Sequence, residues 1–141
     1  MITIINGPNL NLLGKRQPEI YGKENFEKFL RNLRDRYPTT AIEYFQNNCE
    51  GEIIDKLHQL GYESPECEGI IINPGAFAHY SYAIADAIAS ISVPVIEVHI
   101  SNITSREEFR RKSVTAPYCK GIISGFGLYS YEMALTYLLQ A

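Results

Sequence analysis

Short, mainly apolar runs alternate with amphipathic segments along the chain. The apolar runs cover residues 2–6, 41–45, 69–73, 93–100 and 121–125, and turn-forming residues follow them. Such runs are typical of strands buried on both faces of a parallel sheet. Between them, apolar residues recur at the three- and four-residue spacing of one helix face, at Phe26, Phe29, Leu30, Leu33, Tyr37; Ile53, Ile54, Leu57, Leu60; Ile84, Ala87, Ile88, Ile91; and Tyr131, Leu135, Leu138, Leu139. The alternation predicts an α/β fold, because right-handed strand–helix–strand connections place helices on both faces of a parallel sheet.

The number of strands narrows the topology. Five strands favour a flavodoxin-like three-layer sandwich with strand order 2-1-3-4-5, in which ligands bind at the carboxyl ends of the strands. A chain of 141 residues suits one domain, 1–141, and no repeat, linker or low-complexity tract divides it. Residues 7–23 form a connection longer than most strand–helix loops, and we interpret them as a loop and lid over the ligand site.

Composition and charge limit the partners of the protein. The 13 lysines and arginines are outnumbered by 16 acidic residues, so no global basic field attracts nucleic acid, and no apolar run is long enough to cross a bilayer. The first residues, MITIINGPN, lack the charged region and cleavage pattern of a secretory signal. Cys49, Cys67 and Cys119 form no CxxC pair, and we expect reduced, mostly buried thiols. We therefore expect a cytoplasmic protein that binds neither nucleic acid nor membrane.

Polar residues gather where three of the expected strands end. They are Asn6 and Asn9 after the first strand, Asn73 and His79 after the third, and Glu97, His99 and Ser101 in and after the fourth. The strand period of two places Glu97, His99 and Ser101 on one face. Because the carboxyl ends of parallel strands share one edge of a sheet, we expect these side chains to converge there.

Several of these residues also have a purely structural interpretation. Asn6 and Asn9 could cap a turn, and His79 could be a solvated residue in the first turn of the third helix. A lone His99 would be read first as a core histidine. Glu97 can orient its imidazole, however, and an unpaired carboxylate is costly in an apolar strand. We therefore favour a functional role for His99.

Several familiar catalytic motifs are absent from the sequence. No HExxH or cysteine-rich spacing indicates a metal site, and no GxSxG elbow surrounds Ser101. The segment NGPNLNLLG contains neither GxGxxG nor GK[ST], so it does not indicate a phosphate-binding loop for a nucleotide or flavin. We expect neither a metal nor a cofactor.

The segment GKRQPEIYG, residues 14–22, lies within the long loop. A tyrosine with its ordinary pKa of about 10 is a poor base, but a nearby guanidinium favours the phenolate. Arg16 is the candidate partner of Tyr21, while Pro18 stiffens the segment between Gly14 and Gly22. This pattern predicts a lid that delivers a basic phenolate; the alternative is an aromatic side chain that packs back on the body. A phenolate base opposite an imidazole acid suits proton abstraction coupled to departure of a leaving group.

The stretch SREE, residues 105–108, has the spacing of a capping box. In this motif Ser105 caps a helix and Glu108 reaches back to it. We therefore expect a short helix that carries Arg106 and Arg110 on its first turns.

Four separated segments resemble the type II 3-dehydroquinate dehydratases of the shikimate and quinate pathways. They are NGPNLNLLGKRQPEIYG, NPGAFAHYSYAIADAI, EVHISN and REEFR, and the resemblance runs essentially end to end. It implies a flavodoxin-like subunit without cofactor that eliminates water from 3-dehydroquinate, through an enolate, to give 3-dehydroshikimate. It also implies a dodecamer built of four trimers.

The resemblance implies catalytic roles for five residues. Tyr21 as a phenolate takes a proton from the carbon beside the ring ketone, and Arg16 helps to keep it ionised. Asn9 holds a water against the enolate oxygen, which stabilises the developing charge. His99, supported by Glu97, protonates the departing hydroxyl.

The resemblance also implies how the substrate is held. Its carboxylate lies on Asn73, Ser101 and the backbone amides of Ile100 and Ser101. The remaining contacts come from His79 and Arg110, and Asp86 reaches the site from a neighbouring subunit. Arg106 is expected to add positive field without direct contact.

The chain departs from the family pattern beside EVHISN. The family commonly has histidines soon after this segment and after the second arginine, whereas this chain has Ile103, Thr104, Arg111 and Lys112. None of these is a catalytic position. The departures therefore bear on the packing of the short helix or on contacts between trimers.

Other functions also fit the expected fold. A non-catalytic module for small carboxylates would be indicated by the loss of Tyr21, Arg16 or His99, and all three are present. A flavin or phosphoacceptor domain would need a phosphate loop or an acidic cluster after the first strand. The type I dehydratases use a lysine Schiff base on a different fold, and no lysine is expected at the polar edge. The sequence leaves open whether the enzyme serves biosynthesis or quinate breakdown.

Overall fold

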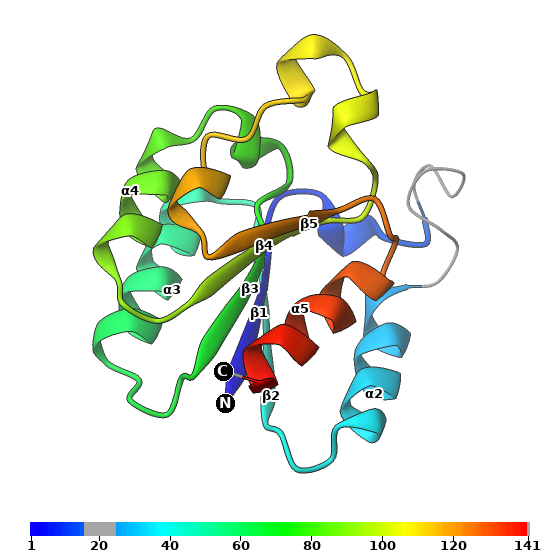
Figure 1. Cartoon of the computed structure of the whole chain (residues 1–141), viewed down its shortest axis with the longest axis vertical. Coiled ribbons are helices and arrows are strands. Elements are labelled where there is room, and N and C mark those ends of the chain that lie inside the picture. The colour runs from blue at the N-terminus through cyan, green and yellow to red at the C-terminus, as the bar shows by residue number, and fades with distance from the viewer. Residues whose placement is uncertain (16–24, 141) are drawn as a thin grey trace.

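The computed structural model describes residues 1–15 and 25–140 of the chain (Figure 1). Its strands are β1 (Ile2–Asn6), β2 (Ile42–Gln46), β3 (Gly69–Asn73), β4 (Val95–His99) and β5 (Gly121–Ser124). Its α-helices are α2 (Phe26–Arg36), α3 (Glu50–Tyr62), α4 (Tyr82–Ser90) and α5 (Tyr129–Gln140). Short 3₁₀ turns are η1 (Leu10–Leu12), η2 (Gly75–His79), η3 (Ile103–Ser105), η4 (Glu108–Arg110) and η5 (Ala116–Tyr118).

Within the described residues, five parallel strands form one sheet in the order β2-β1-β3-β4-β5. The predicted fold and strand order are confirmed. The fourth strand begins at Val95, later than expected, because Pro94 has no N–H to donate to a ladder. The strand ends at His99, so Ser101 lies in the connection that follows it.

Helices cover both faces of the sheet (Figure 1). On one side α3 and α4 pack against it, and their buried Ile53, Leu57 and Ile84 belong to a core cluster with β3. On the other side α2 and α5 bury residues such as Leu33 and Leu135 against β1 and β4. Most residues of the predicted apolar helix faces therefore lie in or against the two halves of the core. Leu139 is the exception, because it is exposed near the end of α5. None of the helices in the described ranges is long and apolar enough to cross a membrane.

Strand register brings the carboxyl ends of the central strands to one edge. Asn6 at the end of β1 lies beside Asn73 at the end of β3, and Ile72 lies beside Glu97 of β4. The connections after β1 and β3 also touch, because the Gly7 amide donates to the Asn73 carbonyl at 2.8 Å. A Cβ on Gly7 would lie 2.5 Å from the Pro74 carbonyl oxygen, so only glycine permits this approach.

The expected helix after Ser105 is wrong. Ser105 ends the 3₁₀ turn η3, which Asn102 caps by accepting the Thr104 amide at 3.1 Å. The short turn η4 stands where the longer helix was expected. The Ser105 hydroxyl instead donates to the Asn102 carbonyl at 2.8 Å. Residues 107–110 are exposed, so no apolar face stabilises a longer helix there.

Two smaller expectations are also corrected. His79 ends η2 and does not open the third helix, which begins at Tyr82 after the Ser81 hydroxyl accepts the Ile84 amide. Cys67 is buried and Cys119 is half-buried, but Cys49 is exposed, because it stands at the start of α3 and not on its apolar face.

Candidate active site

A cavity of about 170 Å³ lies at the carboxyl edge of the sheet. The described residues that line it come from the connections after β1, β3 and β4: Pro8, Asn9, Leu10, Leu12, Leu13, Asn73, Gly75, Ala76, His79, His99, Ile100, Ser101, Ile103, Arg106 and Arg110. Two of these residues are arginines and none is acidic, although the chain as a whole has a net charge of −3. The lining therefore favours a small anionic ligand.

A buried hydrogen-bond network orients Asn73 in the cavity wall. Its Nδ2 donates to the Tyr131 hydroxyl at 2.9 Å, and its Oδ1 accepts the Gly75 amide at 3.1 Å. The Tyr131 hydroxyl donates in turn to Oδ1 of Asn6 at 2.7 Å. Burial raises the pKa of the Tyr131 phenol, which keeps it a donor. One N–H of the Asn73 amide is left for a ligand, since the amide nitrogen carries two hydrogens.

Asn6 supports this wall from behind. It is fully buried, does not line the cavity, and its Nδ2 donates to the Tyr44 hydroxyl at 3.2 Å. Its side chain therefore joins the network below the cavity, a role that differs from the turn cap considered from the sequence.

Asn9 lies at the cavity in a left-handed backbone conformation, with φ of 68°. Asparagine tolerates this region better than most residues. The Asn48 side chain holds the conformation by accepting the Asn9 amide at 3.0 Å. Asn9 stands at the start of η1, but its side chain makes no capping hydrogen bond there. The geometry therefore does not support the turn-cap interpretation of this side chain.

His99 and Glu97 form a hydrogen-bonded pair. Nε2 of His99 lies 2.7 Å from Oε2 of Glu97, and the Glu97 side chain is fully buried behind the imidazole. Because the carboxylate accepts, Nε2 carries a hydrogen, and Nδ1 is left as the other proton-carrying position of the ring. The pairing expected from the EVHIS pattern is present.

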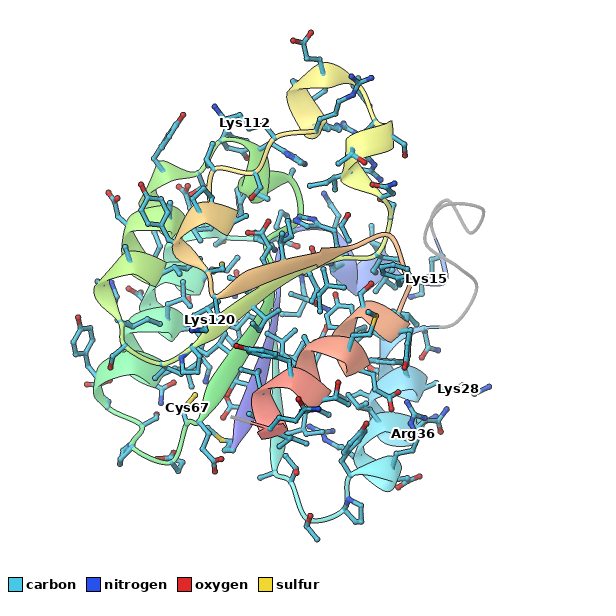
Figure 2. The ribbon with its side chains drawn as sticks, viewed as in Figure 1. Lys15, Lys28, Arg36, Cys67, Lys112 and Lys120 are labelled. Carbon is cyan, nitrogen blue, oxygen red and sulfur yellow. The ribbon has the colours of Figure 1, made fainter. Side chains whose placement is uncertain are left out.

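His79 is fixed from its own side of the cavity. Its Nδ1 lies 2.8 Å from the carbonyl of Lys112, which can only accept, so Nδ1 is the donor and Nε2 remains for a ligand. Figure 2 shows Lys112 just after η4, near the carboxyl edge of the sheet. The rings of His79 and His99 stack with centroids 6.3 Å apart.

The connection after β4 supplies the remaining groups. Ile100 and Ser101 line the cavity. The Ile100 carbonyl accepts the Gly127 amide at 2.9 Å and the Ser101 carbonyl accepts the Ser124 hydroxyl at 3.1 Å, so this segment is held against the end of β5 and the turn that follows it. Arg110 is exposed on η4 and also lines the cavity. Arg106 also lines the cavity, so it lies closer to the site than expected for a residue that acts through its charge without direct contact.

Three candidates are not placed at this cavity. Asp86 is exposed on α4 and is not among the described lining residues of its own chain. Arg16 and Tyr21 lie outside the described residues, as does the second half of the 7–23 loop.

Sequence reasoning missed three residues that support the site. Tyr131 appeared only as one apolar residue of a helix face, and Ser113 and Thr115 were not singled out. The hydroxyls of Ser113 and Thr115 both donate to the Glu97 carboxylate. A fully buried carboxylate needs several hydrogen-bond donors, so a buried Glu97 could have prompted a search of the sequence for hydroxyl residues that donate to it.

Comparisons with known proteins identify the family and agree with the fold. The family model described as "Dehydroquinase class II" matches residues 1–139. A 3-dehydroquinate dehydratase of Caldicellulosiruptor bescii is 55% identical over 136 residues, which cover 95% of this chain and 92% of that protein. One from Thermotoga petrophila is 52% identical over 139 residues, which cover 97% and 93%. The crystal structure of a type II dehydroquinase from Butyrivibrio crossotus superposes with a TM-score of 0.92 at 50% identity, covering 98% and 96%. The chain belongs to the class II dehydroquinase family.

Proposed function

We propose that this chain removes water from 3-dehydroquinate to give 3-dehydroshikimate, through an enolate and without a cofactor. One observation carries the proposal: in a member of this family, an imidazole backed by a buried carboxylate lines a small cavity at the carboxyl edge of the sheet. Loss of a hydroxyl next to an enolate needs a proton donor at the leaving oxygen, and His99 is the group assigned to it. Its Nδ1 is the donor atom, because Nε2 is engaged by Glu97.

The substrate carboxylate is assigned to Asn73, Ser101 and the amides of Ile100 and Ser101. The free N–H of Asn73 and the absence of acidic side chains from the described lining support this assignment. His79 and Arg110 are assigned to the remaining hydroxyls, with Nε2 of His79 available for one of them. Asn9 is assigned to a water that stabilises the enolate oxygen.

The base is assigned to Tyr21, with Arg16 as the cation that favours the phenolate. These two roles rest on the resemblance of residues 14–22 to the family segment and on the chemistry of a phenol beside a guanidinium. Residues 7–23 serve in this proposal as the loop and lid of a single catalytic domain, 1–141. The cytoplasm is the proposed location.

Asp86 is assigned to the site of a neighbouring subunit. Its exposed position on α4, outside the lining described for its own cavity, supports this assignment. A dodecamer of four trimers is the assembly that the family resemblance implies for the chain. The assignment requires at least that two copies meet through α4.

The test adds 3-dehydroquinate to purified protein and follows the ultraviolet absorbance of the conjugated enone product. We expect turnover by the native chain, and a fall of about 10²–10⁴-fold in kcat for Tyr21→Phe and for His99→Ala, the range typical of lost general acid or base catalysis. Ligand affinity should change much less in Tyr21→Phe.

Tyr137→Phe is the matched control, because Tyr137 is an exposed tyrosine on α5 outside the described cavity lining. It should keep native kcat. Unaltered turnover in Tyr21→Phe would remove the base assignment, and inactivation by borohydride in the presence of substrate would indicate a Schiff base and contradict the mechanism.

A further inference from the structure

We propose that Ser113 and Thr115 are positioning residues, which orient the His99 imidazole for proton transfer by fixing the plane of the Glu97 carboxylate. This inference rests on the proposed function, because it takes His99 as the group that protonates the departing hydroxyl. Neither hydroxyl touches the cavity as described, so both act through Glu97.

The Glu97 carboxylate has donors on both of its oxygens. Oε2 accepts from Nε2 of His99 and from the Ser113 hydroxyl, each at 2.7 Å, and Oε1 accepts from the Thr115 hydroxyl. Thr115 and Glu97 are both fully buried. The carboxylate is therefore held at both ends, and only one of its partners belongs to the cavity wall.

Each hydroxyl donates its single hydrogen to the Glu97 carboxylate. The two hydroxyl oxygens also lie 3.1 Å apart, but neither has a second hydrogen for the other. The Ser113 oxygen accepts the Ala116 amide at 3.0 Å, which directs its own hydrogen away from that amide and toward the carboxylate. The donors are thus aligned by the backbone turn that carries them.

That turn is tied to the element that carries His79. The amide of Val114, between the two hydroxyl residues, donates to the Ala78 carbonyl of η2 at 2.7 Å, and Val114 is itself buried. Ser113 and Thr115 therefore reach Glu97 from a segment with a fixed position relative to the cavity. The hydrogen bond from His79 Nδ1 to the Lys112 carbonyl holds the same segment.

The reason for two extra donors lies in the torsional freedom of glutamate. Its terminal χ3 torsion is broad, so a single hydrogen bond to His99 would leave the carboxylate plane free to turn. The direction of the Nε2–H bond would turn with it, and Nδ1 would no longer be held toward a leaving oxygen. Donors on both oxygens remove this freedom and also offset the cost of a buried charge.

Cys119 is one titratable group on which the Glu97 charge acts. Burial, and then the negative charge of Glu97, raises the pKa of this thiol. Cys119 therefore stays neutral near neutral pH and adds no competing charge. His79, Arg106 and Arg110 face His99 or its cavity from the other side.

The decisive variant is Thr115→Val, which removes the hydroxyl and nearly conserves the volume. We expect kcat for dehydration to fall by about tenfold to a hundredfold, the range seen when outer partners of a catalytic group are lost, while KM stays within about twofold. Thr115→Ser keeps a hydroxyl at this position and should restore most of kcat.

Thr3→Val is the matched control. Thr3 is also a fully buried threonine, but it lies near the start of β1, beside Ile70 of β3 and away from the cavity. Figure 2 places Cys67, which precedes β3, at the end of the sheet opposite Lys112. Thr3→Val should keep native kcat, and an equal loss of kcat in it would overturn the inference.

A second measurement separates orientation of the acid from general damage. In D₂O, an enolate that returns to substrate takes up deuterium in place of the hydrogen beside the ring ketone, and NMR follows this exchange. Thr115→Val should exchange at least as fast as native protein while dehydrating more slowly, because an enolate that cannot lose its hydroxyl returns to substrate more often. Exchange and dehydration that fall together would show a merely structural role and overturn the inference.

Ser113→Ala carries the same expectation with less disturbance, because Ser113 is only half-buried. It decides the question if Thr115→Val does not fold. Native dehydration rates in both variants would overturn the positioning role and leave the proposed function standing. A native chain without dehydratase activity would instead remove the proposed function, and this inference with it.

Discussion

At the scale of single residues, Tyr131 links the interior to the cavity. Its hydroxyl joins Asn6 of β1 to Asn73 of β3, although it lies 125 residues from Asn6 along the chain. Its aromatic ring packs against Phe26 and Phe29 of α2. One side chain therefore contributes to the core with its ring and orients the Asn73 amide in the cavity wall with its hydroxyl.

We expect Tyr131→Phe to raise KM for 3-dehydroquinate several-fold with a smaller effect on kcat, because the assigned role of Asn73 is to hold the carboxylate and not the reacting carbons. The free energy of unfolding should fall by about 1–3 kcal/mol, since two buried amides lose a partner. Steady-state kinetics and denaturant unfolding measure the two effects. Native values of both in Tyr131→Phe would contradict this account.

At the scale of elements, the sequence predicted what depends on local pattern. The four helices follow from the spacing of their apolar residues, and the strands at 2–6 and 69–73 follow from continuous apolar runs. The convergence of Asn73, His79 and His99 follows from their places at or after strand ends. The helix expected after Ser105 failed because a capping pattern without an apolar face to bury does not stabilise a helix. Tyr131, Ser113 and Thr115 were missed because their partners are distant in sequence.

The pairing of α2 with α5 contains an ion pair that gives a pH-dependent contribution to stability. Arg36 donates to Glu132 at 2.6 and 3.3 Å, and the Tyr37 hydroxyl donates at 3.0 Å. The hydrogen bonding from Arg36, opposed in part by burial, lowers the pKa of Glu132 from its ordinary value of 4.5. Because the folded pKa is lowered, this stabilisation is present above pH 4.5 and is lost as the pH falls through the lower folded value.

Glu132→Gln should therefore lower the free energy of unfolding by about 0.5–1 kcal/mol at pH 7, a modest amount because Arg36 is half-exposed. The difference from the native chain should shrink as the pH drops below about 4.5. Urea unfolding at several pH values measures it. Glu63→Gln, an exposed acidic residue after α3, is the control and should show no such dependence; a difference for Glu132→Gln that persisted in acid would contradict the assignment.

At the scale of the whole molecule, the assignment of Asp86 bears on how the subunits work together. His99 and Asn73, the residues proposed as acid and carboxylate contact, line the described cavity, whereas Asp86 is exposed on α4. If a neighbouring copy supplies Asp86, each subunit contributes its Asp86 to one neighbouring site and receives Asp86 from another subunit in its own site. Activity then becomes a property of the assembly.

Co-expression of Asp86→Ala with His99→Ala tests this exchange. Each variant alone should be nearly inactive, whereas a random mixed assembly should regain about one quarter of native activity, because some sites combine an intact His99 with an intact Asp86 from the next chain. Mixing the two variants after separate purification and assembly is the control and should restore much less. Mixed assemblies as inactive as the separate variants would refute the shared site.

The contact between Gly7 and the carbonyls of residues 73 and 74 leaves no space between the connections that follow β1 and β3. This contact fixes the starts of the two connections relative to one another, and with them the positions from which Asn9 and Asn73 face the cavity. A substrate that contacts both residues binds groups that are already ordered, so less conformational entropy is lost on binding.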